Sequence, residues 1–303
     1  MAEKTAERSS TESNSRNSNW VWVLYFSICA LPGLFFLDLL KSLAELVRGN
    51  ETYSHIPLIP LVTMVLIYAE RRAIFSERAQ GWKIPATIVV AGAVLLAMVR
   101  LIVPPWDPAE QATLMGLGFV LLWTGTFGVL FGENALRKAV FPLAFLAFAI
   151  PLPPQLFSEL IGLLQKRSAD AVAVIFRIIG LPFARQGFDF ALPGVTIEVA
   201  EECGGIRSTL ALVMTAAIAG HLWLRSFPRT LLLCVTMVPI AIVKNALRIT
   251  LLSWIAVYVN RAILFGPLHR YGGIPFFGLG LAMMGLVLLL LKRLPFHIPA
   301  QGK

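Results

Sequence analysis

The sequence predicts an all-α integral membrane protein with about eight transmembrane helices, an outer interfacial amphipathic helix and a short β-hairpin. Hydrophobic residues make up 57% of the 303 residues and charged residues only 14%, whereas soluble domains carry about 25% charged residues. The charges also fall in short segments between long apolar runs, as in membrane proteins. These observations exclude an ordinary soluble enzyme and a disordered chain, and the presence of only three cysteines excludes a disulfide scaffold. The net charge of +9 does not indicate nucleic-acid binding, because the basic residues lie in those short segments.

The apolar runs predict the transmembrane helices in order. A helix needs about 20 apolar residues to cross a bilayer, and eight runs come close to or exceed that length. The expected spans are 20–37, 52–69, 84–99, 111–132, 139–158, 203–224, 230–259 and 271–291. The fifth helix is expected to end early, because Pro151, Pro153 and Pro154 lie in its run. The seventh run is interrupted by Lys244 and Arg248, and its sequence leaves open whether Lys244 faces the other helices.

The distribution of Lys and Arg predicts the orientation of the chain. Eight spans put both termini on one side of the membrane. If that side is the cytoplasm, the inner segments hold 14 Lys and Arg residues and the outer loops hold 8, which agrees with the excess of positive charge in cytoplasmic loops. We therefore expect a transmembrane domain over 20–291, with a disordered cytoplasmic tail at 1–19 and a second cytoplasmic tail at 292–303.

The long outer loop, 154–202, predicts two further elements. Its first half is amphipathic, with charges on one face and apolar residues on the opposite one. The charged face holds Glu159, Lys166, Asp170 and Arg177, and the apolar face holds Leu160, Ile161, Leu164, Ala171, Val172, Ile175 and Ile178. A helix lying in the membrane interface fits this pattern better than a ninth span, because the charges are spread along its length. The second half predicts a hairpin of 186–192 with 195–199 across Pro193 and Gly194, which could cover a site.

The predicted topology brings polar and ionisable side chains to one depth near the outer membrane face. Cys203 begins the sixth span, and Arg207 lies one turn deeper on the same helix face. Arg248 lies in the outer half of the seventh span, and Asn245 precedes it by three residues. The same side holds Tyr53, Ser54 and His55 at the second span and His269 before the eighth. Ionisable residues within a membrane are functional candidates.

Each candidate also has an ordinary structural interpretation. Cys29 and Cys234 are best interpreted as small buried hydrophobes. Cys203 differs from them, because it lies between two acidic residues and two glycines, outside the hydrocarbon centre. Arg248 could extend its side chain to the lipid headgroups, and His269 could be an ordinary loop histidine. The chain lacks the HExxH, GxSxG and Walker motifs, so nothing favours a zinc protease, an α/β-hydrolase or a P-loop ATPase.

Several segments resemble one known family. Residues 201–208 (EECGGIRS) resemble the cysteine motif of the exosortase/archaeosortase family, and 239–249 (PIAIVKNALRI) resemble its Asn-x-x-Arg-Ile segment. His269 with the following glycines resembles the third motif. The resemblance extends over roughly 20–291, including 53–55 and the proline-containing run 141–153. Gly204 stands where the family usually has serine, and Glu202 where it has a small residue, which leaves the subfamily and the substrate signal open.

The resemblance implies a membrane cysteine peptidase and transpeptidase (a thiol protease) in the bacterial inner membrane, with its active site on the periplasmic face. Its partners would be exported proteins with a PEP-CTERM-like C-terminal sorting signal, made of a short motif, one transmembrane helix and a basic end. Such sorting is linked to envelope or exopolysaccharide biology. The resemblance implies no metal, organic cofactor or nucleic acid.

The residues of the motifs can be given roles in this reaction. Cys203 would form a thioester with the substrate, Arg248 would stabilise the thiolate or oxyanion, and His269 would transfer protons. The supporting or substrate-binding candidates are Arg207, Asn245, Tyr53 and His55.

Two other classes of function stay open at this point. A transporter or channel subunit would suit a broken seventh helix that carries Asn245 and Arg248, because interrupted helices mark transport sites. An envelope glycan or lipid transferase is the third possibility, although the outer acidic residues form no clear cluster in the sequence. Loss of Cys203 distinguishes these classes, because a transporter should tolerate it and an acyl-enzyme should not.

Overall fold

The fold is seen in a computed structural model that describes residues 51–77, 80–101, 107–199, 205–259 and 273–293. Of these residues 82% are helical, and one small sheet of three strands is present. The predicted all-α class is therefore confirmed. The chain divides into two compact units, the first ending at Pro154 and the second beginning at Gln155, and each is described by itself.

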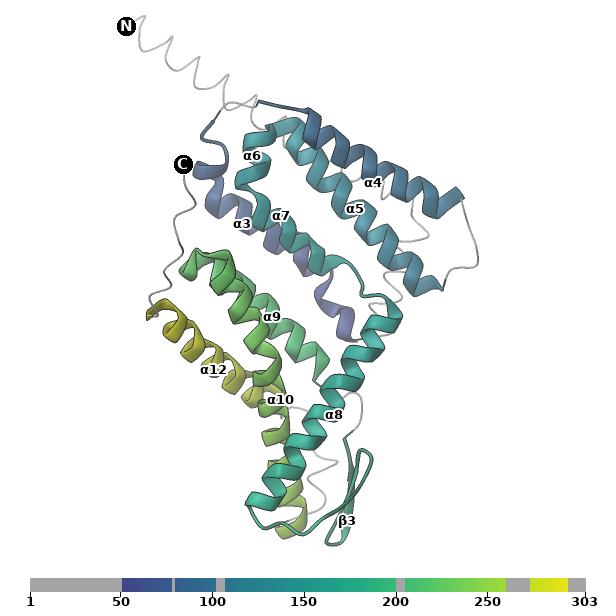
Figure 1. Ribbon diagram of the computed structural model, residues 1–303, viewed down its shortest axis with the longest axis vertical. Coiled ribbons are helices and arrows are strands. Elements are labelled where there is room, and N and C mark those ends of the chain that lie inside the picture. The colour runs from purple at the N-terminus through teal and green to yellow at the C-terminus, as the bar shows by residue number, and fades with distance from the viewer. Residues whose placement is uncertain (1–50, 78–79, 102–106, 200–204, 260–272, 294–303) are drawn as a thin grey trace, which may run out of the picture. The chain divides into compact units, whose positions relative to one another are not determined.

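The first unit is helical throughout its described part. Its elements are η1 (Glu51–His55), α3 (Leu58–Ile74), α4 (Lys83–Leu101), α5 (Pro108–Phe131), α6 (Glu133–Lys138), α7 (Val140–Phe145) and η2 (Leu146–Ala149). Helices α4 and α5 lie side by side (Figure 1). Glycines allow this close approach: a Cβ atom on Gly125 would lie 2.6 Å from the backbone nitrogen of Val89, and one on Gly118 would lie 2.6 Å from Leu96 Cδ2. Small residues are the usual means of packing helices closely in lipid.

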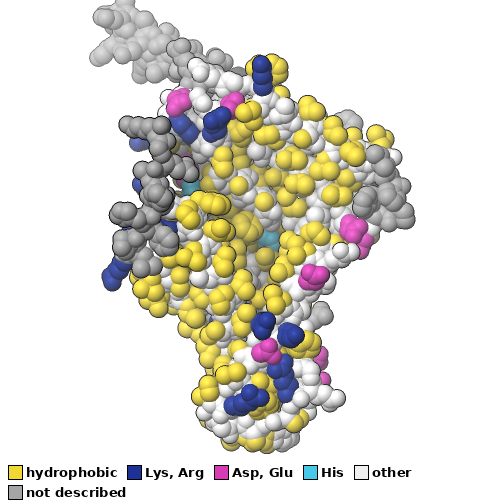
Figure 2. All heavy atoms as spheres, in the orientation of Figure 1, with side chains coloured by type: hydrophobic (Ala, Val, Ile, Leu, Met, Phe, Trp, Pro, Cys, Tyr) yellow, Lys and Arg dark blue, Asp and Glu magenta, His cyan; other side chains and the backbone are white. Residues whose placement is uncertain are grey.

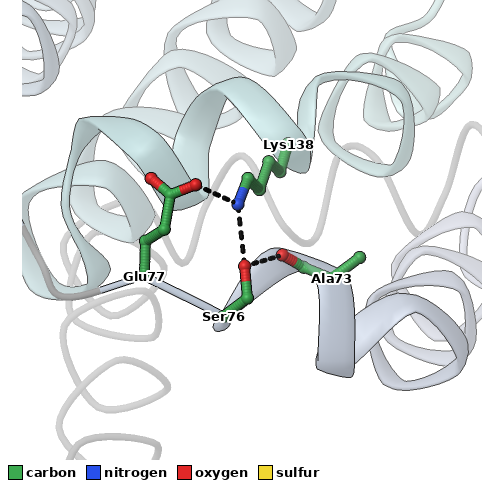
Figure 3. A network of polar contacts seen from close by, with 4 residues as sticks. All are labelled: Ala73, Ser76, Glu77 and Lys138. Carbon is green, nitrogen blue, oxygen red and sulfur yellow. Dashed lines mark hydrogen bonds and ion pairs between the residues drawn. The ribbon is translucent and has the colours of Figure 1, made fainter.

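Polar contacts join the end of α3 to the end of α6 (Figure 3). Lys138 Nζ lies 2.7 Å from Glu77 Oε1 and donates to Ser76 Oγ at 2.8 Å, while Ser76 Oγ donates to the carbonyl of Ala73 at 3.0 Å. The expected spans put the segments 70–83 and 132–138 on the same side of the membrane, and this ion pair joins the two segments at one end of the unit.

The second unit combines long helices with the sheet. Its elements are α8 (Pro154–Ile178), β1 (Ala184–Gln186), β2 (Asp189–Leu192), β3 (Val195–Glu198), α9 (Ile206–Ala219), the π-helix η4 (Gly220–Leu224), α10 (Phe227–Tyr258) and α12 (Gly273–Arg293). Helices α9, α10 and α12 pack on one another (Figure 1). Their shared core is apolar and includes Leu212 of α9, Leu233 and Met237 of α10, and Met284 of α12.

Helix α8 buries one face against protein, and that face differs in part from the predicted apolar stripe. Val172 and Phe176 lie in a core with Phe190 of β2 and with Ile249 of α10, and the rings of Phe176 and Phe190 meet edge to face at 5.6 Å. By contrast, Ile178 is 77% exposed. The prediction erred because it chose the stripe by hydrophobicity alone, while the sheet covers a face that also contains polar residues. The interfacial position of this helix stays a prediction.

The predicted hairpin is present but belongs to a sheet of three strands. Strands β2 and β3 pair antiparallel across Pro193 and Gly194, with Leu192 opposite Val195. The prediction of one strand over 186–192 was wrong, because Gly187 turns the chain with a φ of 62°. Gln186 therefore belongs to β1, which pairs with β2. A glycine with positive φ is the usual residue of such a turn.

The described residues contain six helices long and apolar enough to cross a membrane, or seven if one bent pair is a single span. The bent pair, Val140–Ala149 with Pro154–Ile178, contains most of the expected fifth span, 139–158. As expected, its first helix ends early, at Ala149, and a second helix begins at Pro154. The expected span 20–37 lies outside the described residues, so a total of eight is not established. Figure 2 shows apolar side chains covering the visible face of α4 and α5, as expected for a multi-pass membrane protein.

Candidate functional site

The candidate site lies around the start of α9, where Gly205 precedes the helix with a φ of 72°. Only glycine adopts this conformation routinely. The carbonyl oxygen of Gly205 accepts hydrogen bonds from Ser208 Oγ at 2.9 Å and from Thr209 Oγ1 at 2.8 Å. The first turn of α9 is thus closed tightly around this carbonyl. Cys203 precedes Gly205 by two residues and lies outside the described residues.

Helix α10 brings two buried polar side chains to this turn. Lys244 is 5% exposed, and its Nζ donates to Ser208 Oγ at 2.5 Å. Asn245 is 2% exposed, and its Nδ2 donates to Ser168 Oγ of α8 at 3.1 Å. The side-chain oxygen of Asn245 also lies 3.7 Å from the Cβ position of Gly205. Three helices, α8, α9 and α10, therefore meet in a buried polar junction.

The arrangement of charge at this junction favours an anion. Arg248 is half-buried and lies one helical turn beyond Lys244, so the two cations share a face of α10. Arg207 is exposed in the first turn of α9, where the helix N-terminus adds partial positive charge. A thiolate or an oxyanion near the start of α9 would be stabilised by these groups.

A further buried contact holds the end of β3, on the other side of residues 200–204. Gln165 of α8 is 7% exposed, and its Nε2 donates to the carbonyl of Val199 at 2.7 Å. Val199 is itself fully buried, and its backbone N–H donates to the carbonyl of Phe188 at 3.0 Å. The described backbone on both sides of 200–204 therefore accepts side-chain hydrogen bonds, from α8 at Val199 and from the first turn of α9 at Gly205.

The structure brings together only some of the residues expected from the sequence. Asn245 and Arg248 lie on α10 and Arg207 lies on α9, two of the three helices of the junction, whereas Cys203 and His269 lie outside the described residues. Tyr53 and His55 belong to the first unit. There Tyr53 is 6% exposed, and His55 Nδ1 lies 2.8 Å from the carbonyl oxygen of Thr52.

Sequence reasoning missed Gln165, Ser168 and Ser208, and it left the direction of Lys244 open. A usable signal existed for the first two, because they are polar residues three apart on a face that is otherwise apolar. In the described part of the chain, no group of three or more His, Cys, Asp or Glu side chains is placed to hold a metal ion.

Comparison with known proteins gives one clear match. The family model described as transmembrane exosortase matches residues 45–286, which is most of the chain. The matched region contains the Gly205 turn, Lys244 and Asn245 of α10, and Cys203. No curated protein and no solved structure matches the chain.

Proposed function

The chain belongs to the transmembrane exosortase family, and from this premise we propose that it is a membrane cysteine peptidase and transpeptidase with Cys203 as nucleophile. The observation that carries the proposal is the polar junction at the start of α9, where buried Lys244 and Asn245 lie at the turn that begins with Gly205, two residues after Cys203 in the sequence. A buried lysine in a membrane helix costs stability, so its presence indicates a functional site.

The proposed reaction proceeds through a thioester. The Sγ of Cys203 attacks the scissile carbonyl as a thiolate, and the resulting oxyanion is stabilised by Arg248. His269 protonates the leaving amine as the C–N bond breaks, and the C-terminal fragment departs. Water or an acceptor amine then attacks the thioester and gives a proton to His269. The C–S bond breaks, which releases the product and restores the Cys203 thiolate.

The proposed substrates are exported proteins with a PEP-CTERM-like signal: a short motif, one transmembrane helix and a basic end. The helix would hold the motif in the same membrane as the enzyme, which raises its effective concentration at the site. We place the site at the periplasmic face of a bacterial inner membrane, with both termini in the cytoplasm. Arg207 is exposed at the start of α9 and is our candidate for binding an acidic group of the motif.

The experiment is processing of an exported reporter that carries such a signal, followed by the change in size in membranes. Cys203→Ala should abolish processing while expression and membrane insertion persist, since it removes the nucleophile and little apolar area. Cys234→Ala is the matched control, because Cys234 lies in the helical core of the second unit. Normal cleavage by the Cys203→Ala variant would refute nucleophilic catalysis by this residue.

The structure removes the observation that favoured a transporter. The seventh span was expected to be broken at Lys244 and Arg248, but α10 is one continuous helix of 32 residues, with Pro239 in its interior. It therefore lacks the unwound segment that marks a transport site in discontinuous helices.

A further inference from the structure

The described backbone that borders segment 200–204, which carries Cys203, is tied to two other helices, directly at Val199 and through Ser208 at Gly205. On one side Gln165 of α8 binds the carbonyl of Val199. On the other side Lys244 of α10 binds Ser208, which binds the carbonyl of Gly205. We infer that Gln165 and Lys244 are positioning residues that hold the backbone at Val199 and at Gly205, the two described residues that border the nucleophile segment. This inference rests on the proposed function, because it takes Cys203 as the nucleophile.

The contact of Lys244 has a definite direction. An ammonium group has three donors and no acceptor, so Ser208 Oγ accepts from Lys244 and keeps its own hydrogen for the Gly205 carbonyl. The lysine thus determines which way the serine hydroxyl points. Two successive hydrogen bonds therefore connect α10 to the carbonyl of Gly205, which follows Cys203 by two residues in the sequence.

The helices leave room for the lysine stem. A Cβ atom on Gly280 of α12 would lie 3.3 Å from Lys244 Cδ and 3.1 Å from Leu212 Cδ1. Methionine would fill much of this space without desolvating a charge, so lysine is not the residue that favours stability here. Its effect is expected in the placement of the turn.

Gln165 acts at the other end through a separate hydrogen bond. Strand β3 ends at Glu198, and the carbonyl of the next residue, Val199, is buried. The side-chain amide of Gln165 supplies the donor that this carbonyl needs at 2.7 Å. Gln165 and Lys244 come from different helices and bind different residues, so we expect their effects to be independent.

The two contacts matter for rate because a displacement of about 1 Å in a reacting group can cost about 100-fold. We expect Lys244→Met, Ser208→Ala and Gln165→Met each to lower kcat for reporter cleavage by about 10- to 100-fold with little change in KM. The matched controls are Lys292→Met at the end of α12, Ser253→Ala in α10, and Gln155→Met in the first turn of α8. Ser253 donates to the Ile249 carbonyl within its own helix. All three controls should stay near the wild-type rate.

Combined variants separate positioning from a general loss of structure. If Lys244 acts through Ser208, the double variant Lys244→Met with Ser208→Ala should be no slower than the slower single variant. The losses of Lys244→Met and Gln165→Met should instead multiply. Ser208→Thr keeps the hydroxyl and should retain most of the activity, which provides a test even if Lys244→Met does not fold.

Each outcome of these measurements decides the inference. Rates within about threefold of wild type for Lys244→Met and Gln165→Met would overturn it. So would rate losses of Lys244→Met and Ser208→Ala that multiply in the double variant. Cys203→Ala in the same assay separates this failure from that of the proposed function. An inactive Cys203→Ala variant beside fully active positioning variants refutes only the inference, whereas an active Cys203→Ala variant refutes both.

Discussion

The helix pairs α4–α5 and α9–α10 each pair consecutive helices within one unit, but the contacts that decide their packing differ. Between α4 and α5 the close contacts come from glycines, as at Gly118 and Gly125. Between α9 and α10 a lysine and a serine meet near the start of α9, and apolar residues pack over the rest of the interface. Close apolar packing gives stability in lipid, whereas a buried polar contact is costly there and fixes a particular geometry. The first pair is thus suited to hold the fold, and the second to hold a site.

The strongest test of this comparison is Arg248→Lys on α10. Arginine presents a planar fork of donors and stays charged, whereas lysine is a compact and strongly hydrated ion. We expect the variant to insert and fold normally but to cleave the reporter at least about 100-fold more slowly, as for loss of an oxyanion donor. The measurement is the cleavage rate in membranes at matched enzyme level. A rate within about threefold of wild type would remove Arg248 from the catalytic set and leave it as a residue that reaches the headgroups.

The second test is Gly125→Val in α5, which should affect stability. The added Cβ would meet the Val89 backbone at 2.6 Å, and backbone cannot move aside as a flexible side chain can. We expect a loss of about 1–3 kcal/mol or more, measured as a lower unfolding midpoint in detergent. Gly285→Val is the control, because a Cβ there meets nothing within 4 Å. Equal stability of the two variants would show that the glycine contact is not what holds α4 and α5 together.

The third test is Ser168→Ala, which removes the partner of the Asn245 amide. Ser168 is fully buried and accepts from Asn245 Nδ2 at 3.1 Å. Leaving a buried donor without this acceptor should lower stability by about 1–3 kcal/mol. Ser253→Ala deletes an equally buried hydroxyl whose bond stays within α10 and should cost less. The difference between the two unfolding midpoints measures the bond between α8 and α10, and no difference would assign Asn245 to other contacts.

The smallest expected effect is that of Lys138→Met in the first unit. Lys138 joins α6 to the end of α3 through Glu77 and Ser76, but its side chain is 34% exposed and that of Glu77 is 54% exposed. Exposed ion pairs contribute about 0–1 kcal/mol, and salt screens them. We expect a small drop in the unfolding midpoint that disappears at high salt. A large drop that persists in salt would mean that this contact holds the first unit as strongly as the glycines do.

The helices could be predicted from the sequence because a membrane span is a long apolar run. Such a run can be recognised without knowing its tertiary contacts. The runs at 84–99, 111–132 and 230–259 correspond to α4, α5 and α10, with ends shifted by a few residues. Strand β1 was missed because its separation from β2 depends on one turn at Gly187. The burial of α8 was missed in part because it depends on the sheet that packs against it.

The candidate site was predictable only where residues were unusual for their place in the chain. Arg248 and Asn245 stand out in an apolar run, and the structure places Asn245 in the junction. Gln165 stands out only as a polar residue on a mostly apolar helix face, and Ser208 does not stand out at all. Only the hydrogen bonds across helices show what these two residues contact. The expected roles of Cys203, His269, Tyr53 and His55 stay predictions.

The connection from α9 to α10 is short. The π-helix η4 ends at Leu224, Arg225 takes a φ of 50°, and α10 begins at Phe227. A Cβ on Gly220 would lie 2.6 Å from Thr230 Cγ2, so the helices are pressed together at this end. Each residue of an α-helix advances the chain by about 100° around its axis. One residue inserted between Thr230 and Lys244 would therefore rotate the lysine away from Ser208 while leaving the composition of α10 almost unchanged. The contact at Gly220 thus fixes the rotation of α10 about its axis at this end. The number of residues from Thr230 to Lys244 then decides which way the lysine side chain points.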